Sequence, residues 1–83
     1  GGSNTAVGQG SLDANTTASD NTAVGKDALG ANTTGTNNVA VGAYALDANT
    51  TARFNTALGY EALTANTAED NTAVTTLRLV CML

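Results

Sequence analysis

The side chains of this sequence that could take part in acid–base or metal chemistry are carboxylates, and they are spread thinly along the chain. Because histidine is absent, Ser-His-Asp and Cys-His arrangements are excluded, and a zinc site would have to combine the single cysteine, Cys81, with carboxylates. The spacing of the carboxylates does not follow the glycine- and aspartate-rich pattern of calcium-binding repeats. We therefore predict that the protein is not an enzyme and that it has no catalytic residue, cofactor or metal. The carboxylates considered for these roles are Asp13, Asp27, Asp47, Glu61, Glu69 and Asp70.

Three asparagines fit the acceptor pattern for N-glycosylation, because each begins an Asn-Thr-Thr sequence: Asn15, Asn32 and Asn49. They lie 17 residues apart, so glycans attached to them would line one edge of a repeating structure. The same tripeptide is also typical of a turn, because asparagine and threonine side chains hydrogen-bond to nearby backbone groups. Both interpretations stay open, and the turn is favoured for a bacterial or viral protein.

Composition and charge exclude several classes of protein. The net charge is −4 with three basic residues, so binding to a nucleic-acid backbone is not expected. The chain has no run of 18 apolar residues, so membrane insertion is not expected either. A single cysteine rules out a framework of intramolecular disulfides. Large apolar residues are few, with no tryptophan, one phenylalanine and two tyrosines, so a single copy is expected to be marginally stable and to need partners.

One phrase, Asn-Thr-Ala-Val-Gly or a close variant, recurs along the sequence. Four copies begin 17 residues apart at Asn4, Asn21, Asn38 and Asn55, and a fifth begins at Asn71, 16 residues after the fourth. A fixed period of this size indicates a stack of similar units, each burying a face against the next. We expect one repeat domain spanning 1–83. Its units are 4–20, 21–37, 38–54, 55–70 and a partial unit 71–83.

Each unit begins with the pattern of a short strand. In the third unit, alternation places Val39 and Val41 on one face and Ala40 on the other. A glycine then ends the strand and marks a corner that needs a positive φ or the close approach of a neighbouring backbone. The next segment carries one large side chain, a leucine, and is either a second short strand or a single helical turn. A long helix is disfavoured because every unit contains Gly, Asn and Thr, and a disordered linker is disfavoured by the strict period. The corner glycines are Gly8, Gly25, Gly42 and Gly59.

We therefore predict an all-β fold, a repetitive parallel β-solenoid or β-roll with one coil per 17-residue repeat. Stacking would place equivalent aliphatic side chains on one another, such as Val24 on Val7 and Leu46 on Leu29, so that valine and leucine columns run inside. The predicted core columns are Val7, Val24, Val41, Leu58 and Val74, and Leu12, Leu29, Leu46 and Leu63.

Asparagines would also align in two columns. Asparagine side chains stacked at strand spacing can donate and accept hydrogen bonds along the stack, which gives them a structural role without any ligand. The predicted ladders are Asn4, Asn21, Asn38 and Asn55, and Asn15, Asn32, Asn49 and Asn66.

The sequence N-T-A-V-G followed by A-L, A-N-T-T-G and N resembles the repeats of bacteriophage tail-fibre proteins and similar bacterial surface proteins. It is also similar, more distantly, to the S-V-A-I-G repeat in the YadA-like heads of trimeric autotransporter adhesins. The resemblance covers residues 4–74, and its specificity lies in the repetition, because each motif is short and built of common residues.

This resemblance implies a trimeric, extracellular fibre of parallel β-roll or β-prism type, on a virion or a cell surface. It also implies that the aliphatic residue before each glycine points inward, as does the residue two positions earlier. The units here are longer than the adhesin repeat, and we expect neither a coiled-coil stalk nor a membrane anchor. The positions concerned are Val7, Val24, Val41 and Leu58, and Thr5, Thr22, Val39 and Thr56.

The function we expect is that of a structural protein, the shaft of an extracellular fibre or of a self-assembling filament. Its main partner would be itself, as a homotrimer or an end-to-end filament, with a cell-surface or glycan receptor as a further partner. The alternative is a binding module that uses its repeated face to bind ice or a glycan. The threonine rows suggest ice binding, although such faces usually carry T-x-T within a strand and these units place Thr beside Thr.

Overall fold

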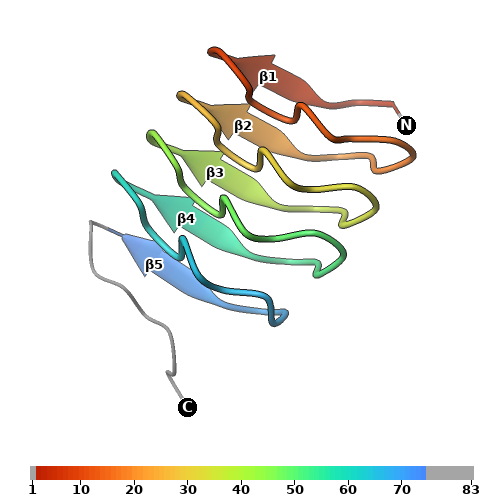
Figure 1. Ribbon diagram of the computed structural model, residues 1–83. Helices are drawn as coiled ribbons and strands as arrows, with labels where there is room; N and C mark the ends of the chain where they lie inside the picture. The colour runs from red at the N-terminus through yellow and green to blue at the C-terminus, as the bar shows by residue number, and fades with distance from the viewer. Residues whose placement is uncertain (1, 75–83) are drawn as a thin grey trace.

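The computed structural model describes residues 2–74, which form a parallel β-solenoid whose five short strands lie one above the other like rungs (Figure 1). The sheet order is β1-β2-β3-β4-β5, and every pair of neighbours is parallel. The described residues contain no helix, so the predicted all-β class and the single coil per repeat are confirmed. The final part of the fifth unit, 75–83 with Cys81, lies outside the described residues. The strands are β1 (Thr5–Val7), β2 (Thr22–Val24), β3 (Val39–Val41), β4 (Thr56–Leu58) and β5 (Thr72–Val74).

The register places each residue on its equivalent in the next unit, as Ala23 on Ala40 and Ala40 on Ala57. The register is kept between β4 and β5, although their unit is one residue shorter. In the preceding unit, the side chain of Asn49 reaches the carbonyl of Ala52 three residues on. In the shorter unit, Asn66 reaches Ala68 two residues on. This turn is therefore one residue shorter than in the other units, and the register of the sheet is unchanged.

The segment that carries the leucine is neither a strand nor a helical turn, so both alternatives for it are wrong. It is a run of overlapping tight turns in which the N–H of Asp13 donates to the carbonyl of Gly10 (3.2 Å), and the N–H of Asn15 to that of Leu12 (3.1 Å). Between these bonds, the N–H of Leu12 crosses to the carbonyl of Ala28 in the next coil (3.1 Å). The four leucines have φ values of 51 to 53°, which is rare for this residue type and directs each side chain into the coil.

The corner glycines meet both conditions that sequence analysis proposed for them. Gly25 has φ +129, and a Cβ atom on it would lie 2.6 Å from the carbonyl carbon of Gly42 in the next coil. Gly8 has the same relation to Gly25, at 2.8 Å. Only glycine therefore lets successive coils stack at strand spacing at this corner.

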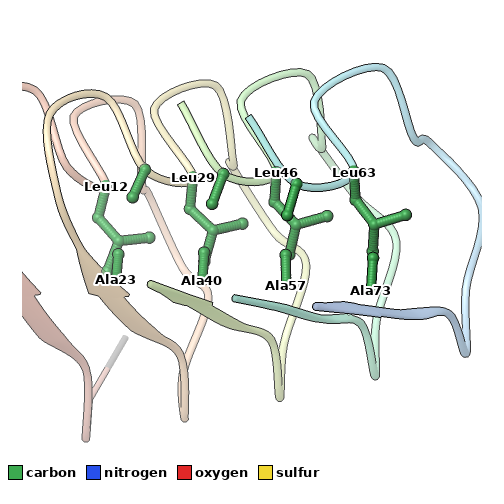
Figure 2. Packing of buried hydrophobic residues seen from close by; sticks show 11 residues of the cluster. Leu12, Ala23, Leu29, Ala40, Leu46, Ala57, Leu63 and Ala73 are labelled. Atoms are coloured by element: carbon green, nitrogen blue, oxygen red, sulfur yellow. The ribbon is translucent and has the colours of Figure 1, made fainter. Parts of the chain in front are cut away.

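The core is a column of leucines facing a column of alanines. Leu29, Leu46 and Leu63 are at most 1% exposed, and Leu12 is 8% exposed. Figure 2 shows each leucine pointing to the strand alanine of the following coil, as Leu46 does toward Ala57. The predicted leucine column is thus buried. The strand alanines that face it are Ala23, Ala40, Ala57 and Ala73.

The predicted valine column is wrong, because the side chains before the corner glycines lie on the outer face of the sheet. Val7 and Val74 are each 57% exposed and Leu58 is 46% exposed, while Val24 and Val41 are only partly buried. The threonine positions two residues earlier also face outward: Thr5 and Thr56 are exposed, Val39 is 38% exposed and Thr22 is partly buried. The inward position of each strand is its central alanine.

The reason for this difference is the narrow interior of a 17-residue coil. The leucine of the opposite wall already fills the space above each strand, as Leu46 does above Ala57 (Figure 2). A β-branched side chain facing that leucine would overpack the interior, whereas a methyl group fits. The strand alternates as predicted, but its small side chains, not its large ones, point inward.

Candidate functional site

The first asparagine column forms a hydrogen-bonded spine that ties each coil to the next. The backbone N–H of Asn38 donates to Oδ1 of Asn21 (2.9 Å), and the N–H of Asn55 donates to Oδ1 of Asn38 (3.0 Å). Both ends of the column repeat the bond, from Asn21 to Asn4 and from Asn71 to Asn55. The ladder is therefore built from side chain to backbone, and not from side chain to side chain as stacked amides would suggest.

The same asparagines also close their own coil. Nδ2 of Asn21 donates to the carbonyl of Gly35 (2.8 Å), and Nδ2 of Asn38 donates to that of Ala52 (3.0 Å), 14 residues further along the chain. Asn21, Asn38 and Asn55 are at most 1% exposed. Because buried polar groups are costly unless they are paired, these bonds specify both the size of the coil and its register.

The second asparagine column lies at the turn that precedes the next strand. Nδ2 of Asn32 donates to the carbonyl of Gly35 (3.0 Å), the acceptor that Asn21 also uses, so the two columns converge there. One bond runs along this column between side chains, from Nδ2 of Asn49 to Oδ1 of Asn32 (3.0 Å), in the form that the sequence predicted. The columns are also joined directly, by Nδ2 of Asn55 and Oδ1 of Asn49 (3.2 Å).

Burial of this column contradicts the glycosylation hypothesis for two of its three candidate sites. Asn32 and Asn49 are 0% exposed, and their amide nitrogens donate hydrogen bonds inside the coil. A glycan on Nδ2 would have to occupy the core, so the folded coil cannot carry one at these positions. Asn15, in the first coil, is partly exposed, and its Nδ2 lies 3.4 Å from the carbonyl of Ala18. The Asn-Thr-Thr sequence is thus a structural turn in the coils that follow.

The outer face of the sheet is the main apolar surface of the described chain. It consists of two columns of side chains, one before and one after the central alanine of each strand, and none of these side chains is charged. Four of the six exposed large hydrophobic side chains belong to it: Val7, Val39, Leu58 and Val74. The others, Phe54 and Tyr60, flank β4 at 50% and 54% exposure. We call the ten outward strand side chains the sheet face.

A small polar and aromatic cluster lies on the corner segment that follows the strands. Nζ of Lys26 lies 3.1 Å from Oδ2 of Asp27, 3.3 Å from the hydroxyl of Tyr44 and 5.2 Å from the centre of the Tyr44 ring. Tyr44 and Tyr60, from successive coils, meet edge to face with ring centres 6.0 Å apart. The hydrogen bonds to Asp27 and Tyr44 raise the pKa of Lys26.

Among the acidic residues, Asp47 has a carboxyl group whose pKa is shifted by its surroundings. Partial burial and the neighbouring charge of Asp27 raise the pKa of its carboxyl group, and Lys26 opposes this effect. Among residues 2–74, no three Asp, Glu, Cys or His side chains gather as a group that could hold a metal ion. Glu69 forms an exposed ion pair with Arg53 (3.6 Å), of the kind that contributes little to stability. The carboxylates are thus scattered over the surface of the coils.

Sequence reasoning missed the alanine column and the Tyr44–Tyr60 pair. The alanine had a signal, because the central strand residue is alanine in all five units, whereas the flanking positions vary between Thr and Val or between Val and Leu. A position that never varies in size is one where space is fixed. The tyrosines had none, because they occupy different positions of their units, two residues and one residue after the corner glycine.

No protein-family model matches this chain, and neither a curated protein nor a solved structure is significantly similar to it. Within the described part of the chain, no helix is long and apolar enough to cross a membrane.

Proposed function

We propose that this chain is a structural protein, a segment of the shaft of an extracellular fibre or of a self-assembling filament, on a virion or a cell surface. The observation that carries this proposal is the asparagine spine. It uses buried polar side chains to make the same bond between each coil and the next, as from Asn38 to Asn21 and from Asn55 to Asn38. These buried side chains serve the stacking of coils.

The way in which coils cover one another also supports a shaft of stacked coils. β1 has one neighbouring strand in the described sheet, and its Ala6 is exposed where Ala23, Ala40 and Ala57 are completely buried. Each of those alanines is covered by the leucine of the preceding coil. A further coil before β1, from this chain or from another copy, would cover Ala6 in the same way and continue the stack. The resemblance to tail-fibre and adhesin repeats agrees with this role, and a trimer is a second way to build the same shaft.

Light scattering from micromolar to millimolar concentration tests the proposal. We expect species well above the 8.2 kDa mass of one chain, with a mean mass that rises with concentration. A folded species of 8.2 kDa over the whole range would contradict it. Full retention of the circular dichroism spectrum after exhaustive chelation is expected as well, because the proposal needs no metal.

A second candidate, a binding module for ice, is favoured by one specific observation. The threonines at the start of four strands face outward beside the aliphatic residue that ends the strand, as Thr22 does beside Val24, and they are in register along the sheet except at β3, where Val39 takes this position. The structure thus presents a regular, uncharged array of hydroxyl and methyl groups, which the adjacent Thr-Thr pairs of the sequence did not suggest. Thermal hysteresis of a purified sample separates this candidate from the structural one, and a glycan array tests the related binding of a receptor sugar.

A further inference from the structure

We propose that the sheet face is a lateral interface, and that its occupant is the sheet face of a second copy of this chain. This inference rests on the proposed self-assembly and goes beyond it by naming the surface. The first step is the distribution of apolar side chains. Among residues 2–74, the buried apolar side chains are leucine and alanine, while the outward strand positions carry valine, leucine and threonine. Six of the ten side chains of the sheet face are aliphatic, and Val7, Leu58 and Val74 are about half exposed, so covering the face would bury apolar surface.

If two copies associate, the distribution of charge favours the sheet face as the surface on which they meet. Each copy carries a net charge of −4, so two copies repel one another at most approaches. No residue of the five strands is charged, so two sheet faces can meet without bringing like charges together. The charged residues next to the sheet, such as Asp20, Lys26 and Arg53, lie beside the strands and not within them.

The period of the face favours the same occupant. Its two columns are in register from β1 to β5, with Val7 on Val24, Val24 on Val41 and Val41 on Leu58. Only a surface with the same axial spacing can make an identical contact at every coil. A second copy has that spacing because it is built from the same repeats. Two sheets packed face to face interdigitate their side chains at a separation of about 10 Å. The side chains of one copy would therefore fit between the two columns of side chains of the other copy.

The area of the face sets the strength of the contact. The face is five strands wide at about 4.8 Å per strand and three residues long at about 3.3 Å per residue, so its area is on the order of 200 Å². A stable interface between two proteins buries about 800 Å² on each partner. One pair of faces is therefore weak, and the interaction gains strength as coils are added. Such an increase of strength with length is expected of a fibre in which copies of the chain associate side by side through many coils.

Sedimentation velocity from micromolar to millimolar concentration tests the proposal with three proteins. Leu58→Lys places a charge in the middle of the face, and Thr51→Lys places the same charge on an exposed residue outside it. We expect the association constant of Leu58→Lys to fall at least tenfold, and that of Thr51→Lys to equal the original. Circular dichroism checks that each variant is folded. If Leu58→Lys does not fold, Val39→Lys on the neighbouring strand replaces it.

The outcomes distinguish the two proposals. If Leu58→Lys associates as strongly as the original chain, the face is not an interface, while self-assembly through the coil ends still stands. If the original chain does not associate at any concentration, self-assembly itself is refuted and the interface with it. If it stays a monomer but shows thermal hysteresis that Leu58→Lys abolishes, the face binds ice, and the proposed interface is overturned.

Discussion

The side chain of Leu46 points toward Ala57, one coil further along the solenoid, and neither residue is exposed to solvent (Figure 2). This pairing sets the inner dimension of the coil. A leucine from the turn side and a methyl group from the strand side fill the interior together, and the larger strand residues are left outside. The inward side chain of each strand therefore stabilises the coil, and the outward side chains remain available for the contact proposed above.

The first prediction compares valine at two adjacent positions of β4. Ala57→Val adds two carbon atoms to the space that Leu46 fills, so we expect the free energy of unfolding to fall by about 1–3 kcal/mol. Thr56→Val is the matched control, because Thr56 is exposed and the equivalent position of β3 already carries Val39. Its free energy of unfolding should change by less than about 0.5 kcal/mol. Chemical denaturation measures both, and equal effects would show that the two faces of the strand are wrongly assigned.

The sequence was sufficient to predict the architecture, because a strict repeat of strand, glycine and turn has few compact solutions. The 17-residue period of Asn4, Asn21 and Asn38 predicted the coil, and the single leucine of each unit predicted one wall of the core. The asparagine columns were also predicted, although the bonds along the first column join a side chain to the backbone. What these features share is that each occurs once per unit, so stacking aligns it without further information.

The sequence did not reveal which face of the strand lies inside. In a large domain the bigger apolar residues of an alternating strand point inward, because burial stabilises them most. Here the available volume decides, and it depends on the distance between the two walls of the coil. That distance follows from the run of turns around Leu46 and its positive φ of 52°, which no strand pattern reveals. Val41 is thus displaced from the interior by a leucine on the opposite wall.

The second prediction concerns the glycine corner. In Gly25→Ala the new Cβ would clash with the backbone of Gly42, since it would lie 2.6 Å from one of its atoms. The alanine would also have to keep a φ of +129, which strains its backbone, and both effects destabilise the folded state. We expect a loss of more than about 2 kcal/mol in the free energy of unfolding. Gly2→Ala serves as the control, because a Cβ there meets nothing within 4 Å. Thermal melts that shift equally for the two variants would contradict the close stacking of this corner.

The third prediction concerns the asparagine spine. Asn38→Ala removes the acceptor of the buried Asn55 N–H, which should cost about 1–3 kcal/mol. It also removes the bond from Nδ2 to the carbonyl of Ala52, although Asn49 still donates to that carbonyl. Thr51→Ala, at an exposed position of the same unit, should be close to neutral. If amide hydrogen exchange at Asn55 is as slow in Asn38→Ala as in the original chain, the spine does not stabilise the stack.

The fourth prediction is a pH dependence that arises from Asp47. Partial burial and the charge of Asp27 raise the pKa of Asp47 in the folded state, so the charged carboxylate is less favourable in the folded than in the unfolded chain. The corresponding loss of stability appears as the pH rises from the ordinary value of 3.8 through the folded-state pKa, and it is absent below 3.8. Asp47→Asn should therefore raise the melting temperature at pH 7 and not at pH 3. A gain of the same size at both pH values would show that the carboxylate charge is not its cause.

Electron cryo-microscopy of the purified, concentrated protein tests the central claim, that this chain builds a fibre from stacked coils, most directly. The account predicts elongated assemblies that contain many chains, with an axial repeat of about 4.8 Å for each coil. Only isolated particles, none of them longer than a single chain, would contradict it.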